Sequence, residues 1–117
     1  MGKMSRDKGA RGEREIASIL RDYGYSQAAR GCQRQGGPDS PDVKNLPGIH
    51  IEVKRTEKFS LYDALDQAKR DAESINMPAV FHRRNNHPWV VVMELADWIE
   101  LYREWEAGKY ERSNDQV

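Results

Sequence analysis

Residues 49–55 constrain the fold of this chain more than any other segment. Three apolar residues alternate there with three polar ones, in the order Ile49, His50, Ile51, Glu52, Val53 and Lys54. Successive side chains of a β-strand point to opposite faces, so this alternation predicts a strand with one apolar face and one charged face. We therefore take residues 49–55 as the central strand of a sheet.

Hydrophobic periodicity divides the rest of the chain into three helices and four more strands. The helices are predicted at residues 10–23, 61–75 and 95–107, and the additional strands at residues 25–30, 42–45, 79–83 and 89–93. Gly24, Pro78 and Gly108 are placed to end the three helices. This order of elements predicts a small α/β domain built on one sheet.

The length of the chain, 117 residues, suits one domain with a modest core. We expect that domain at residues 10–106, between a flexible basic arm at 1–9 and a polar tail at 107–117. No apolar run is long enough to span a membrane, and the first residues lack the pattern of a signal peptide. The single cysteine, Cys32, excludes an internal disulfide and fits a reducing cytoplasm.

The formal net charge is zero, but the charges are distributed unevenly. Residues 1–36 carry eight Lys and Arg against four Asp and Glu, whereas residues 94–117 carry three basic groups against seven acidic ones. A basic end opposite an acidic end attracts phosphate on one side of the molecule. The alternative is that both ends are ordinary solvated surface.

Two carboxylates and a lysine gather around the central strand. Asp42 lies ten residues before Glu52, near enough for a short turn to bring both carboxylates to one edge of the sheet. Together with Lys54 they suit a hard divalent cation such as Mg²⁺, which activates water beside a phosphate. Asp39, in the Gly- and Pro-rich loop 31–41, competes with Asp42 for the first position. We prefer Asp42, because a predicted strand begins directly after it.

Two helical residues are further candidates for this site. Glu13 lies three residues before Ile16, on the apolar face of the first helix, so it is expected to face the sheet and to need a partner or a metal there. The alternative is a role in capping the helix or balancing its dipole. The amide of Gln67, in the second helix, is a candidate accessory group near the metal, or an exposed helix residue. His50 shares the face of Glu52, so it either reaches the edge of the site or, like most histidines in such positions, lies on the surface.

These positions resemble a known family. The segment Lys8-Gly-Ala-Arg-Gly-Glu-Arg-Glu-Ile16, followed by Arg30, Asp42 and Ile51-Glu-Val-Lys54, resembles the archaeal-type Holliday-junction resolvases of the PD-(D/E)xK nuclease superfamily. The resemblance implies a restriction-endonuclease-like fold, with a mixed sheet flanked by helices in the order αβββαββα, and a homodimer that cuts two strands of DNA.

The resemblance also implies roles for individual residues. Asp42 and Glu52 would bind Mg²⁺, with Mn²⁺ as a substitute, while Lys54 would orient or help deprotonate the attacking water. Glu13 would bind a second metal ion or that water. Basic side chains would contact DNA phosphate: Arg14 and Arg30 by matching position, with Arg34, Lys8 and Arg11 as further candidates.

The sequence therefore predicts a Mg²⁺-dependent DNA endonuclease that prefers branched DNA. Two departures from the resolvases leave alternatives open: the loop 31–41 is longer, and residues 66–72 are closer to superfamily members with a glutamine on the second helix. The alternatives are another nuclease of the superfamily (nicking, restriction-like or exonucleolytic) and a catalytically inactive DNA-binding module.

The last predicted helix carries an aromatic stripe formed by Trp98, Tyr102 and Trp105. Such a stripe belongs either to the core or to an interface between subunits. Because one domain carries one predicted metal site, paired cuts require two copies, and a two-fold homodimer is the simplest arrangement.

Overall fold

The computed structural model describes residues 2–31 and 40–115, with side chains at 8–31, 40–109 and 111. In chain order the elements are α1 (Gly2–Asp22), β1 (Ala29–Arg30), β2 (Val43–Lys44), β3 (Ile49–Arg55), α2 (Leu61–Asp71), β4 (Met77–Arg83), β5 (Val90–Val92) and α3 (Leu95–Asp115). The predicted order of helices and strands is therefore confirmed.

The five strands form one sheet in the order β1-β2-β3-β4-β5. The pairs β1–β2, β2–β3 and β4–β5 are antiparallel, whereas β3 and β4 are parallel. A parallel pair needs a crossover connection, and α2 provides it. The fold is thus the predicted α/β arrangement, with β3 at the centre of a mixed sheet.

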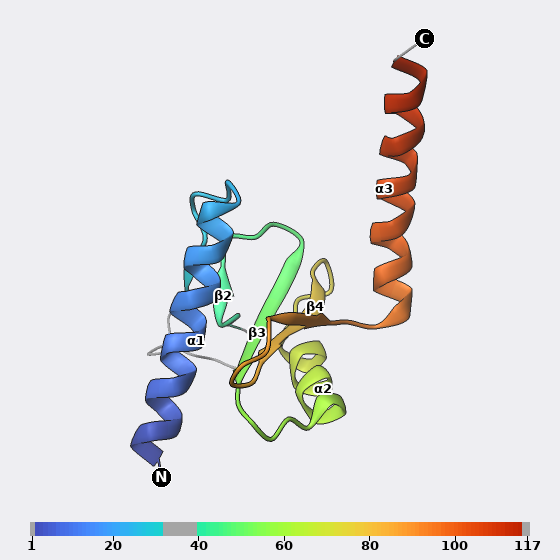
Figure 1. Cartoon of the computed structure of the whole chain (residues 1–117). Helices are drawn as coiled ribbons and strands as arrows, with labels where there is room; N and C mark the ends of the chain where they lie inside the picture. The colour runs from blue at the N-terminus through green and yellow to red at the C-terminus, as the bar shows by residue number, and fades with distance from the viewer. Residues whose placement is uncertain (1, 32–39, 116–117) are drawn as a thin grey trace.

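Helices α1 and α2 lie on opposite sides of β3 (Figure 1). On the α1 side the core consists of Ile16, Ala17, Val43, Ile51 and Val53. On the α2 side it consists of Ala64, Leu65, Ala68 and Val80. Covering on both faces buries β3 from residue 50 to residue 53, so His50 and Glu52 lie inside the molecule, whereas Lys54 and Arg55 are half-buried.

Gly12 sets how closely α1 approaches β3. A Cβ atom added at Gly12 would lie 2.7 Å from the Cβ of Arg55 and 3.3 Å from a methyl carbon of Val53. Only a residue without a side chain lets the helix lie this close to the strand. The next residue, Glu13, is thereby brought against the sheet.

Two helices are longer than the periodicity indicated. Helix α1 begins at Gly2, so residues 2–9 are helical where we expected a flexible arm. Helix α3 passes through Gly108 and continues to Asp115, where we expected a polar tail. One glycine inside a helix costs only about 1 kcal/mol relative to alanine, which does not by itself end a helix. The expected domain limits, residues 10 and 106, stay a prediction.

Helix α3 extends away from the sheet and from the other two helices (Figure 1). Its apolar side chains are exposed, with Trp98 at 48%, Tyr102 at 40% and Trp105 at 53%. The Trp98 and Tyr102 rings stack with centroids 5.4 Å apart. The stripe is therefore not part of the core.

Across the described residues, no helix combines the length and the apolar composition that crossing a bilayer requires.

Because α1 lies so close to β3 at Gly12, replacing Gly12 and Gly9 of this helix by alanine should change the stability of the protein in opposite directions. Gly12→Ala should lower the free energy of unfolding by about 1 kcal/mol or more, because the new methyl group overpacks the contact with β3. Gly9 has nothing within 4 Å of an added Cβ, so Gly9→Ala should raise the free energy by up to about 1 kcal/mol through helix propensity. Urea denaturation measures both, and equal effects would contradict the packing argument.

Candidate active site

Asp42 is attached to β3 on both sides of Glu52. The backbone N–H of Asp42 donates to the carbonyl of Ile51 at 2.8 Å, and the N–H of Val53 donates to Oδ2 of Asp42, also at 2.8 Å. Gly31 supports this position from the other side, since its N–H donates to the Asp42 carbonyl at 2.8 Å. The structure thus brings Asp42 and Glu52 together, as the ten-residue spacing suggested.

The Glu52 carboxylate is buried, with the residue only 3% exposed. It shares a hydrogen bond with the carboxyl group of Asp42. Its Oε1 atom lies 2.9 Å from Nε2 of His50, which is 2% exposed. Of the two expectations for His50, the structure agrees with contact at the site and not with a surface position, because the strand that carries it is covered on both faces.

Glu13 reaches the same region from α1. It is 9% exposed and receives a hydrogen bond of 2.9 Å from Nε of Arg30 to its Oε1. Its negative charge acts on Asp42. The prediction that Glu13 faces the sheet is confirmed. Arg30, expected at DNA phosphate, forms an ion pair with Glu13 in this structure.

Lys54 and Gln67 are in contact between β3 and α2. Nζ of Lys54 donates to Oε1 of Gln67 at 3.2 Å. Lys54 lies two residues after Glu52 and so shares its strand face. The Gln67 amide oxygen therefore accepts a hydrogen bond from the lysine and helps to position its ammonium group.

The crowding of carboxylates changes the acidity of Asp42. Burial, helped by the negative charge of Glu52, raises the pKa of Asp42 from 3.8 to about 7. The charge of Glu13 acts in the same direction, whereas the hydrogen bond from the Val53 amide lowers the pKa. A buried carboxyl group that resists ionisation next to other carboxylates is an environment that a bound cation would relieve.

The donor set fits a hard cation that keeps part of its hydration shell. Glu52 in β3 and Asp42, the residue directly before β2, supply carboxylate oxygens. Within residues 2–31 and 40–115, no group of three or more His, Cys, Asp or Glu side chains is arranged to hold a metal ion. A cation at this pair would therefore complete its coordination with water and substrate oxygens. This is how Mg²⁺ commonly binds, through one or two carboxylates together with phosphate.

The other basic residues predicted to contact DNA differ in whether they are exposed, paired with a carboxylate or outside the described residues. Arg11 and Arg14 are exposed on α1. Nζ of Lys8 lies 3.4 Å from a carboxylate oxygen of Glu57. Arg34, and also the competing Asp39, lie outside the described residues.

One network was not predicted from the sequence. Oε1 of Glu15 accepts from Nη1 of Arg83 at 2.6 Å and from Nε1 of Trp89 at 2.7 Å. It connects α1 to the end of β4 and the start of β5, and so stabilises the helix that carries Glu13. The sequence offered no signal for it, because the partners are separated by about seventy residues.

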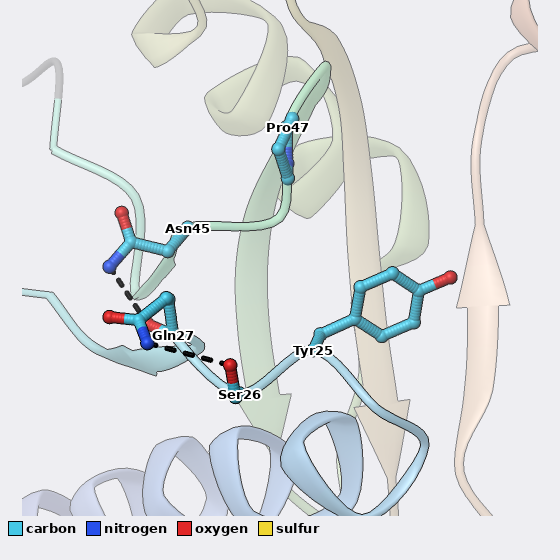
Figure 2. A pocket seen from close by; sticks show the side chains of 5 residues that line it. All are labelled: Tyr25, Ser26, Gln27, Asn45 and Pro47. Atoms are coloured by element: carbon cyan, nitrogen blue, oxygen red, sulfur yellow. Dashed lines mark hydrogen bonds between the residues drawn. The ribbon is translucent and has the colours of Figure 1, made fainter.

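A shallow pocket of about 440 Å³ lies apart from the carboxylates. It is lined by Tyr25, Ser26, Gln27, Asn45 and Pro47 (Figure 2). Nδ2 of Asn45 donates to the Gln27 carbonyl at 2.8 Å and closes one side. None of its lining residues is acidic or basic, so it is not part of the acidic site.

Residues 4–116 match the sequence profile of a family described as phage putative PDDEXK endonuclease. The chain belongs to this family. Pro41-Asp42 and Glu52-Val53-Lys54 follow the pattern that the PDDEXK name abbreviates. The mixed sheet flanked by helices agrees with the restriction-endonuclease-like fold of such nucleases. The family description supports a nuclease and does not specify the resolvase subtype. No curated protein and no solved structure matches the chain.

The raised pKa of Asp42 predicts how stability depends on pH in this PDDEXK protein. Because the pKa is higher in the folded state, the stability associated with Asp42 is complete below pH 3.8 and is lost as pH rises through about 7. Across that interval, the free energy of unfolding should fall by at most about 1.4 kcal/mol per pH unit. Without divalent cations, thermal melts should show this decline in the wild type and a much flatter profile in Asp42→Asn. The exposed Asp66 offers a control, since Asp66→Asn should keep the wild-type profile. Parallel profiles for wild type and Asp42→Asn would contradict the assignment.

Proposed function

We propose that this protein hydrolyses DNA phosphodiesters as a divalent-metal-dependent endonuclease, with Asp42, Glu52 and Lys54 at its centre. The observation that carries the proposal is the pair formed by half-buried Asp42 and buried Glu52, with a lysine two residues further along the strand of Glu52. Membership of the PDDEXK family supports the same conclusion.

In this proposal Asp42 and Glu52 hold a Mg²⁺ ion, for which Mn²⁺ can substitute. The bound cation would lower the pKa of a coordinated water and neutralise charge that develops on the phosphate. Lys54 hydrogen-bonds the attacking water and adds positive charge beside the scissile phosphate. The contact with Gln67 restricts the lysine side chain on the strand face that Glu52 shares.

Glu13 is the third acidic group of the proposed centre. Its influence on the pKa of Asp42 is consistent with a role in binding a second metal ion or the attacking water. Arg30 forms an ion pair with Glu13 and would move to DNA phosphate when substrate binds. Exposed Arg11 and Arg14, together with Lys8, would extend this phosphate-binding surface along α1.

We further propose that the active form is a homodimer that prefers branched DNA. The exposed aromatic stripe of α3 supports a dimer, because the described part of the chain does not cover it. The resemblance to junction resolvases supports branched DNA as substrate. A nicking, restriction-like or exonucleolytic enzyme, or an inactive DNA-binding module, would be the alternative.

Conservative changes at the proposed metal ligands test catalysis directly. Asp42→Asn and Glu52→Gln should each reduce the rate of DNA cleavage in Mg²⁺ by about a hundredfold or more, because an amide cannot replace a charged ligand. DNA binding should persist or tighten, since negative charge has been removed near the phosphate. Gel assays of cleavage and mobility shift measure both quantities.

Asp39→Asn is the decisive comparison for these variants. Loss of cleavage in Asp39→Asn, with retention in Asp42→Asn, would assign the ligand to the other Pro-Asp pair. An inactive DNA-binding module would instead shift DNA with or without Mg²⁺ and cleave none of the substrates.

The proposed assembly predicts a mass in solution of twice the 13.5 kDa of one chain. Trp98→Asp combined with Trp105→Asp should yield monomers by light scattering, because charge cannot be buried in an aromatic interface. Exposed Tyr62 on α2 provides a control, and Tyr62→Asp should leave the mass unchanged.

On a panel of linear, nicked, flapped and four-way DNA, the wild type should cut the four-way substrate fastest. A monomeric wild type with equal rates on all substrates would exclude the resolvase-like reading.

A further inference from the structure

The contact between His50 and Glu52 has no part in the function proposed so far. The two residues lie two positions apart on β3 and therefore share one face of the strand. His50 is 2% exposed, Glu52 is 3% exposed, and their side chains meet at 2.9 Å. Buried polar side chains are paired in folded proteins, and these two residues provide each other with a partner.

One oxygen of the Glu52 carboxylate is in contact with the imidazole ring of His50. Nε2 of His50 lies at Oε1 of Glu52, so an imidazole with its proton on Nε2 donates a hydrogen bond to that oxygen. The same carboxylate also interacts with the side chain of Asp42. The contact with His50 at 2.9 Å restricts rotation of the Glu52 side chain.

We propose that His50 is a positioning residue that orients the Glu52 carboxylate for cation binding. This inference rests on the proposed function, in which Asp42 and Glu52 hold the metal ion. Groups that hydrogen-bond a metal ligand fix its orientation, and their removal typically weakens metal affinity about 10–100-fold. His50 itself does not touch the cation or the DNA.

Calorimetric titration of the protein with Mn²⁺, in the absence of DNA, tests this role without relying on activity. His50→Leu removes the donor and should weaken Mn²⁺ affinity about 10–100-fold. His50→Gln keeps an N–H donor of similar reach and should recover most of the affinity. Ile51→Val is the matched control, because it shortens a fully buried side chain on the opposite face of the same strand and should leave affinity unchanged.

Cleavage assays supply a second readout. In His50→Leu, the Mg²⁺ concentration for half-maximal cleavage should rise, while the rate at saturating Mg²⁺ should approach that of the wild type. If circular dichroism shows that His50→Leu does not fold, His50→Asn replaces it, since its shorter side chain cannot reach Glu52 and should show the same weakened affinity.

The outcomes separate this inference from the proposed function. Wild-type protein that binds no Mn²⁺ and cleaves no DNA would overturn the proposed function. Wild-type protein that binds and cleaves, together with a folded His50→Leu of unchanged affinity, would overturn only the role of His50. A His50→Gln variant that is folded but as weak as His50→Leu would also overturn it, because the hydrogen bond would then not be the cause.

Discussion

The arrangement of the site depends on the attachment of Asp42 to β3. Its amide and its carboxylate bond to the backbone on either side of Glu52, which brings the half-buried Asp42 side chain next to the buried Glu52 side chain. This is unfavourable for their charges, and the pKa of Asp42 rises to about 7. Strongly shifted acids of this kind concentrate at functional sites, because structural stability alone gives no reason to bring them together.

Three other elements meet around this pair, and each has its own packing reason. Gly12 allows α1 to lie close against β3, which brings Glu13 to the sheet. Helix α2, as the crossover between parallel strands, places Gln67 against Lys54. Glu15 connects α1 to the β4–β5 region and keeps the helix in position. The acidic centre is therefore supported by helices on both faces of the sheet.

The acidic helix α3 is the part of the molecule least explained by this arrangement. It leaves the sheet after β5, and its aromatic stripe is exposed. An isolated helix with an exposed apolar face gains little stability in water, since most helical stability comes from packing. In the described part of the chain, α3 therefore lacks the packing that stabilises α1 and α2 against the sheet.

The sequence by itself determined the order of elements, the central strand and the proximity of Asp42 to Glu52. These follow from local periodicity and short spacing, which depend on neighbouring residues alone. Only the tertiary structure decided that His50 is buried against Glu52, that Arg30 pairs with Glu13, and that the stripe of α3 is left uncovered. Burial depends on which helix covers which face of the sheet, and a long-range ion pair depends on where two distant segments meet. Neither burial nor a long-range ion pair can be predicted from the spacing of residues along one segment.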